Sequence, residues 1–261
     1  MERSLWTAAT GMAAQQVNMD TIANNLANLS TNAFKRSRPV FVDLLYQTLN
    51  APGTASSSST NLPSGVQLGL GARTSSVQKM FEQGEFKPTE NPLDVIIAGR
   101  GFYKFTQPDG TEVYSRDGAF TLDENGNIVN SMGYPLNPPM VIPQDANSIT
   151  IAPDGTVSVQ LSDNTVTQLG NIEVANFINP GGLQALGDNL FVNTVASGDA
   201  ISGTPGQDGL GELRQGFLET SNVNIVGELV DMITAQRAYE LNSRSIRSVD
   251  DMLRLLGQLV R

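Results

Sequence analysis

The chain has 261 residues, 39% of them hydrophobic, and it contains neither cysteine nor histidine. The absence of these two residue types excludes disulfides, thiol nucleophiles, histidine general bases, and zinc sites built from cysteine and histidine. The 26 acidic and 16 basic residues give a formal net charge of −10, which repels nucleic acid and anionic lipid surfaces.

The first thirty residues carry an apolar pattern that predicts a long amphipathic helix. Apolar side chains repeat in sevens along two adjacent registers, as they do at the a and d positions of paired helices. The segment lacks the basic start and apolar block of a secretory signal, and no apolar run approaches the roughly 20 residues of a membrane span. We therefore expect no cleaved signal peptide and no membrane insertion. The residues assigned to the seam are Leu5, Met12, Met19, Ile22, Leu26 and Leu29.

The middle of the chain has a different pattern. Residues 51–61 form a polar spacer that is too poor in apolar side chains to pack a core, and we predict an extended connector there. From residue 95 onward, strand-like runs alternate with turn dipeptides such as Asp109-Gly110, Asn125-Gly126 and Asp154-Gly155. Both residues of such a dipeptide accept the positive φ of a hairpin turn, so residues 95–205 predict an antiparallel β domain.

A second apolar stripe runs from Val226 to Val260, with no proline after Pro205. It predicts a helix of about 35 residues, far longer than the globular average. The residues assigned to its seam are Val230, Ile233, Leu241, Val249, Met252 and Leu256.

The order helix, β domain, helix predicts an α+β fold in which the two ends of the chain pair. Each terminal seam would lose of order ten kcal/mol if it stayed exposed, at roughly 1.5–3 kcal/mol per large side chain. We therefore expect a discontinuous, coiled-coil-like helical domain (1–38 with 217–261) and an extended β-hairpin and connector region (39–94 with 206–216). The antiparallel β domain (95–205) would be looped out. The outer helix faces are small and weakly charged, which favours packing against further copies in a helical homopolymer.

No segment predicts catalysis, a metal or a cofactor. Gly99-Arg100-Gly101 belongs to no phosphate-binding motif, and the segment 123–127 lacks the later glycine and glutamate of a calcium loop. The basic cluster Lys35-Arg36-Ser37-Arg38 follows a helix end, where cations satisfy the helix dipole or a neighbouring acidic surface. Asp250-Asp251 lies within a predicted helix, where a solvated or inter-subunit charge is the ordinary interpretation. We expect no catalytic, metal-binding or cofactor-binding residue.

Two long motifs at opposite ends of the chain resemble those of the bacterial flagellar basal-body rod and hook family. The first spans residues 22–36 and the second residues 216–240, while residues 114–123 resemble the β domain of that family. The residues that carry the resemblance are Asn24, Asn25, Leu26, Ala27, Asn28, Phe34, Lys35, Ser221, Asn222, Gln236, Arg237, Ala238 and Tyr239.

Within the family, the chain length and the run Phe41–Leu49 are most similar to the distal-rod subunits. One position departs from the pattern, because Ala33 stands where relatives usually carry glycine before the phenylalanine. If a left-handed residue is needed there, Asn32 tolerates that conformation better than Ala33, so we expect the chain path to shift by one residue.

The resemblance implies a structural subunit and not an enzyme. Family members polymerise through their terminal helices, so the chain would form a rigid tubular shaft that spans the periplasm and transmits motor torque to the hook. The implied partners are copies of itself, proximal-rod subunits, the hook protein and surrounding ring proteins. Export by the flagellar type III apparatus would agree with the missing signal peptide, and the spacer 51–61 would touch adjacent subunits.

Two alternatives stay open at this point. Within the family, the chain could be a proximal-rod or hook subunit. In a different class, it could be a secreted carbohydrate-active enzyme or adhesin that uses the turns and acidic surface of the β domain, although no acid pair is evident from the spacing.

Overall fold

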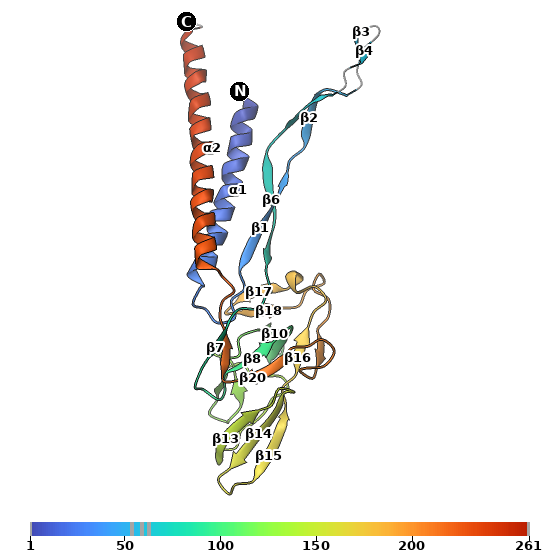
Figure 1. Cartoon of the computed structure of the whole chain (residues 1–261), viewed down its shortest axis with the longest axis vertical. Coiled ribbons are helices and arrows are strands. Elements are labelled where there is room, and N and C mark those ends of the chain that lie inside the picture. The colour runs from blue at the N-terminus through green and yellow to red at the C-terminus, as the bar shows by residue number, and fades with distance from the viewer. Residues whose placement is uncertain (1, 53–54, 58–59, 62–63, 260–261) are drawn as a thin grey trace. The chain divides into compact units, whose positions relative to one another are not determined.

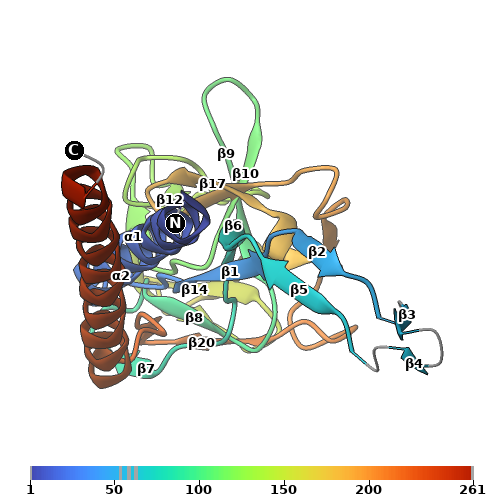
Figure 2. The same cartoon turned by 90° about the horizontal axis from the view of Figure 1, so that it is seen from above.

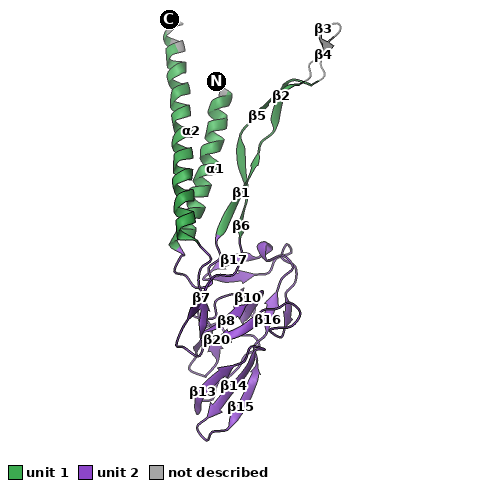
Figure 3. Ribbon diagram, viewed as in Figure 1, with its two compact units in different colours: residues 1–27, 37–79, 224–261 green, residues 28–36, 80–223 purple. Residues whose placement is uncertain are grey.

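A computed structural model describes residues 2–52, 55–57, 60–61 and 64–259 of the chain. The chain divides into two compact units (Figure 3). The terminal unit comprises residues 1–27, 37–79 and 224–261, and the β unit comprises residues 28–36 and 80–223. The fold class is α+β, as predicted, whereas the coiled-coil geometry and the three-part domain division stay predictions. Within the described residues, no helix is long and apolar enough to cross a membrane.

Two helices form one part of the terminal unit and lie alongside each other (Figure 1). The helix α1 covers Glu2–Ala27 and α2 covers Ile225–Leu259, whose 35 residues match the predicted length. The α2 helix begins after Asn224, whose side-chain oxygen accepts the backbone N–H of Gly227 at 3.1 Å and so caps the helix. Glu228 places a carboxylate in the first turn, where its negative charge interacts favourably with the helix dipole.

The other part of the terminal unit is a two-stranded ribbon, seen from above in Figure 2. The strand β1 (Ser37–Asp43) pairs with β6 (Ala72–Lys79), β2 (Tyr46–Asn50) with β5 (Val66–Gly69), and β3 (Ala55–Ser57) with β4 (Thr60–Asn61). The spacer 51–61 therefore belongs to the end of a paired ribbon, and residues 53–54 and 58–59 of it lie outside the described part. Both β1 and β6 contact α1.

The β unit is built from antiparallel strand pairs, as predicted. A six-stranded sheet has the order β17-β18-β10-β9-β16-β19, and β13-β14-β15 form a three-stranded sheet. The pairs β8–β20, β7–β21 and β11–β12 complete the unit. Since β7, β20 and β21 lie outside 95–205, that predicted range covers only part of the unit. The bounds are β7 Phe86–Pro88, β8 Val95–Ala98, β9 Phe102–Thr106, β10 Glu112–Ser115, β11 Thr121–Leu122, β12 Ile128–Val129, β13 Ala146–Ile151, β14 Thr156–Leu161, β15 Val166–Asn171, β16 Val174–Asn176, a 3-10 turn Pro180–Gly182, β17 Gln184–Gly187, β18 Leu190–Val192, β19 Ile201–Gly203, β20 Glu212–Gln215 and β21 Phe217–Glu219.

Tight turns and two apolar clusters explain this arrangement. Gly110 and Gly155 adopt φ values of 85° and 86°, which a hairpin turn requires and a side chain would disfavour. Strands β8, β9, β10 and β14 supply the larger core cluster, around Tyr103 and Phe105. The Tyr103 hydroxyl donates to the Val95 carbonyl at 2.8 Å, so this buried polar group has a hydrogen-bond partner. Burial raises the pKa of the Tyr103 hydroxyl well above its ordinary value.

Candidate assembly site

The two helices of the terminal unit meet along a seam of small and polar side chains. Asn25 donates from Nδ2 to Glu228 Oε2 at 3.2 Å, and a Cβ added to Gly11 would lie 2.9 Å from Asn242 Nδ2. These two contacts are separated by the same number of residues on each helix, in opposite directions, so α1 and α2 are antiparallel. The buried seam positions of α2 are Glu228, Ala235 and Val249, and Asn242 between them is half-buried.

This seam corrects the predicted pairing face of α2. Val230, Ile233, Leu241 and Met252 are exposed in the single chain, so they do not pack against α1. Val249 is buried, and the side chain of Leu256 lies outside the described part. The prediction selected the bulkiest apolar register, whereas small residues bring the two helices close enough for the Asn25–Glu228 hydrogen bond. On α1, Ile22 is buried, and Leu5, Met12, Met19 and Leu26 are half-buried. Leu29 is half-buried too, but it lies beyond the end of α1, in the β unit.

Asn25 is the polar anchor at one end of the seam. It is 1% exposed, and its side-chain amide makes a two-way hydrogen bond with Ser37, accepting from the Ser37 N–H at 2.8 Å and donating to the Ser37 carbonyl at 2.9 Å. One side chain therefore fixes the start of β1 and also reaches α2. An asparagine is suited to this position because its amide offers both a donor and an acceptor.

The bulky side chains of α2 gather on the side opposite the seam. Val226, Val230, Ile233, Leu241 and Leu255 recur at helical spacing, and each is between 54% and 71% exposed. We call these five residues the outer face of α2. Covering one such side chain typically contributes about 1.5–3 kcal/mol, so the whole outer face represents of order ten kcal/mol when exposed.

A second constellation, in the β unit, joins the first and last parts of that unit. Glu219 on β21 is 2% exposed, and its carboxylate accepts from Lys35 Nζ at 2.6 Å, Arg116 Nε at 3.2 Å and the Gly84 N–H at 2.8 Å. Lys35 Nζ also donates to the Glu82 carbonyl at 2.7 Å. We call Lys35, Arg116 and Glu219 the charge clamp.

The pKa of Glu219 is shifted towards the charged carboxylate. Burial by itself would raise the pKa of the Glu219 carboxyl, but the positive charges of Arg116 and Lys35 and the hydrogen bonds outweigh it, so this pKa lies below its ordinary 4.5. Burial lowers the pKa of the Lys35 ammonium from 10.5, against the opposing effect of Glu219. Such a cluster is strongly destabilised if one member is removed, because the others stay buried without a partner.

Asn222 and Ala33 attach the same two segments through backbone contacts. The Asn222 side chain accepts the Arg36 N–H at 2.8 Å and donates to the Met80 carbonyl at 2.8 Å, and the Ala33 N–H donates to the Glu219 carbonyl at 2.8 Å. Ala33 itself has a φ of 54°, whereas Asn32 does not have a positive φ. The expected one-residue shift is therefore wrong, because the Ala33 N–H is held by Glu219 and Ala33 accepts the left-handed strain.

Three family models match the chain, and together they contain most of these residues. They are described as "Flagella basal body rod protein" (residues 5–35), "Flagellar hook protein FlgE/F/G D1 domain" (96–159) and "Flagellar basal body rod FlgEFG protein C-terminal" (214–259). The flagellar basal-body rod protein FlgG of Borreliella burgdorferi is 50% identical, with 100% of both chains covered. The proteins of the same name from Buchnera aphidicola (Schizaphis graminum) and Bacillus subtilis are 51% and 36% identical, covering 98% and 100% of this chain.

The chain belongs to the flagellar basal-body rod family. This is a family of structural rod proteins and not of enzymes. Among the described residues, no group of three or more acidic side chains is placed to hold a metal ion.

Membership of the rod family gives the two terminal motifs a structural meaning. Asn25 and Asn222 satisfy backbone groups, Lys35 belongs to the charge clamp, and Phe34 is buried. Lys35 is therefore a buried ion-pair partner and not part of a basic surface cluster. The remaining motif residues lie elsewhere: Asn24, Ala27, Gln236, Arg237 and Tyr239 are exposed, and Leu26, Asn28, Ser221 and Ala238 are half-buried.

The charge clamp was not predicted as a unit. Lys35 is one of the named motif residues, whereas Arg116 and Glu219 lie within the longer matching segments 114–123 and 216–240. Both terminal motifs contain a charged residue next to strand-like apolar residues, and that combination was the available signal for a buried ion pair.

Proposed function

We propose that this chain is a subunit of the flagellar distal rod and polymerises with copies of itself into a rigid tubular shaft. The shaft would span the periplasm and transmit the torque of the motor to the hook. Its partners would be proximal-rod subunits, the hook protein, the surrounding ring proteins and the flagellar type III export apparatus, which exports it without a cleaved signal peptide. Relatives named flagellar basal-body rod protein match this chain over essentially their whole length, which supports this proposal.

The outer face of α2 is the observation that carries the proposal. A helix with bulky apolar residues on the side opposite its intramolecular seam needs a second partner, and another copy of the chain is the partner that a homopolymer supplies. Contacts repeated along a 35-residue helix are numerous and mutually redundant. A tube held in this way resists slippage under torque because no single contact carries the load.

Substitutions on the outer face separate assembly from folding. We expect the double variant Val230→Ser with Leu241→Ser to abolish tube formation, as judged by electron microscopy and sedimentation of the purified chain. Unfolding of the single chain should stay unchanged, since both side chains are exposed there. The matched control is Val166→Ser on β15, where a 71% exposed valine is removed from the β unit. Tubes formed by the double variant at the wild-type yield would contradict the proposal.

A further inference from the structure

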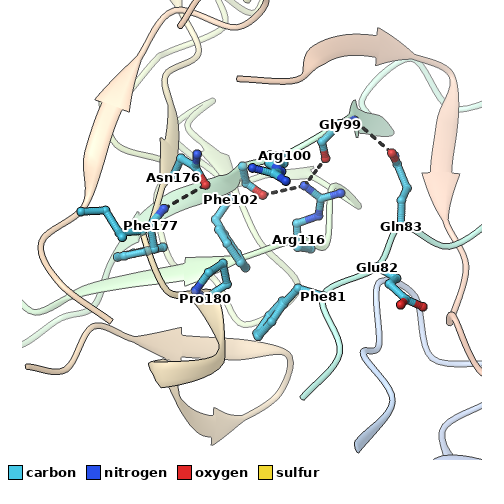
Figure 4. Close-up of a pocket in the computed structure, with 12 residues that line it drawn as sticks. Phe81, Glu82, Gln83, Gly99, Arg100, Phe102, Arg116, Asn176, Phe177 and Pro180 are labelled. Carbon is cyan, nitrogen blue, oxygen red and sulfur yellow. Dashed lines mark hydrogen bonds between the residues drawn. The ribbon is translucent and has the colours of Figure 1, made fainter. Parts of the chain in front are cut away.

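The β unit contains a pocket beside the charge clamp (Figure 4). Its cavity volume is about 590 Å³, and its lining includes Phe81, Phe102, Phe177, Arg100, Arg116 and Glu82. We call it the Phe102 pocket. A volume of this size admits several side chains.

The floor of the Phe102 pocket is aromatic and rigid. Phe102 packs edge-to-face against Phe81 and Phe177, with ring centroids 5.4 and 5.6 Å apart. Phe102 and Phe177 are each 3% exposed, so their rings are fixed by the core on the far side. At the mouth, Ile178 is 84% exposed, which leaves a large apolar side chain beside an apolar floor. Because Phe102 and Phe177 are already covered, an apolar occupant would be stabilised by burial of its own side chain and of Ile178.

Arg100 gives the pocket a charge preference. Arg116 already bonds to Glu219 and to the carbonyls of Gly99 and Gly101, at 2.8 and 2.7 Å. Arg100 is exposed and has no ion-pair partner among the residues that the structure describes. Because Arg116 is paired with Glu219, Arg100 is the cation of the lining that remains available, so the pocket suits an apolar side chain followed by a carboxylate.

The chain itself supplies that combination. Between Arg116 and Arg214 there is no lysine or arginine, whereas acidic residues recur throughout. Within this interval, which the structure describes completely, Leu122 is the only exposed large apolar residue directly next to an acidic one. Leu122, Asp123 and Glu124 are all exposed at the β11–β12 hairpin.

The two carboxylates at this hairpin differ in availability. Asp123 is used within the turn, where Oδ1 accepts the Glu124 N–H at 2.8 Å. The Glu124 side chain has no polar partner among the described residues. It is therefore the carboxylate that is free to reach a cation on another molecule.

We propose that the Phe102 pocket of one copy receives the Leu122–Gly126 hairpin tip of a neighbouring copy. Leu122 packs beside Ile178 above the aromatic floor, and Glu124 pairs with Arg100 at the rim. The contact is heterologous, because pocket and tip are different surfaces, so it propagates along a polymer. This inference rests on the proposed homopolymer and names one of its subunit contacts.

The absence of native cysteine makes disulfide trapping a clean test. Isolated basal bodies carrying Leu122→Cys with Ile178→Cys should give, on mild oxidation, a ladder of dimers and higher oligomers in a denaturing gel. The matched control is Val166→Cys with Ile178→Cys, which introduces a thiol at a more exposed position of the β unit, 71% for Val166 against 43% for Leu122, and should give no ladder.

Charge reversal provides a second readout. We expect Arg100→Glu and Glu124→Arg each to lower the rod yield about tenfold, and the double variant to recover it to within about threefold of wild type. Rods that assemble normally without the specific ladder, or single variants with wild-type yield, would overturn the inference and leave the proposed function intact. Capture of a different basal-body protein by a photo-crosslinker at position 178 would also overturn it. Absence of the unsubstituted chain from rods would instead overturn the proposed function.

Discussion

The Lys35 ammonium nitrogen lies 2.6 Å from Oε1 of Glu219, with the two side chains 0% and 1% exposed. The two residues are 184 positions apart in the sequence, so the contact closes the β unit between its first and last segments. Arg116 completes the clamp from a third segment. The clamp contains two cations and one carboxylate, so its net charge is positive. Lys35 and Arg116 therefore both depend on Glu219 for an opposite charge.

We expect Glu219→Gln to destabilise the β unit by about 3–5 kcal/mol, because it leaves two cations buried with no opposite charge. Lys35→Met should cost less, since Arg116 and the Gly84 N–H still neutralise the carboxylate. Urea unfolding followed by circular dichroism measures both. The control is Glu112→Gln, which removes the partly exposed Lys104–Glu112 pair and should change stability by at most about 1 kcal/mol. Equal losses for Glu219→Gln and Glu112→Gln would contradict this account.

The clamp also predicts how stability depends on acid. The folded pKa of Glu219 lies below its ordinary 4.5, so the unfolded chain binds more protons between these two values. The contribution of Glu219 to the free energy of unfolding is therefore complete above pH 4.5 and is lost as the pH falls through the folded pKa. We expect Glu219→Gln to flatten the acid limb of a stability curve measured by urea unfolding. Some slope should persist, because hydrogen bonds at the turns also lower the pKa of Asp109, Asp154 and Asp163. An unchanged acid limb would contradict the prediction.

Regular elements could be predicted closely from the sequence because their signals are local. The strand-like runs that begin at residue 95 include Val95–Ala98, Glu112–Ser115 and Thr156–Leu161, and the structure forms β8, β10 and β14 over the same residues. Each is bounded by turn residues whose backbone preference is independent of the rest of the fold. The absence of proline similarly set the length of α2.

The helix seam could not be predicted in the same way because two faces of α2 compete for burial. Its bulky register, which includes Ile233 and Leu241, has the stronger apolar signal, yet the register that packs against α1 contains Glu228, Ala235 and Asn242. Apolar patterning shows which side chains are to be buried, but it does not show whether they are buried by the same chain or by another copy. A polar partner on α1, Asn25, decides the register, and that pairing is non-local.

Ala33 gives a direct test of backbone strain. A left-handed alanine costs about 1–2 kcal/mol, and glycine avoids this cost while losing a buried methyl group and gaining unfolded-state entropy. We therefore expect Ala33→Gly to stay within about 1 kcal/mol of wild type. Ala33→Val should lose about 2 kcal/mol or more, because a β-branched side chain tolerates the φ of 54° least and the site is 2% exposed. Thermal unfolding of both variants measures the difference in stability. A valine variant as stable as the glycine variant would show that the backbone at residue 33 is not strained.

Gly84 tests the backbone side of the charge clamp. Its N–H donates to Glu219, and a Cβ at this position would collide with the carbonyl oxygen of Thr220, which is backbone and cannot turn away. We expect Gly84→Ala to cost about 1–3 kcal/mol, the usual range for overpacking, and to do so in the β unit. Gly227→Ala is the matched control: its nearest neighbour would be Asn224 Cγ at 3.7 Å, and alanine is the better helix former, so α2 should gain slightly. Hydrogen exchange resolved by segment locates both changes. Unchanged protection of the β21 amides in Gly84→Ala would contradict this prediction. It would show that the charge clamp does not depend on the close packing of residue 84 against β21.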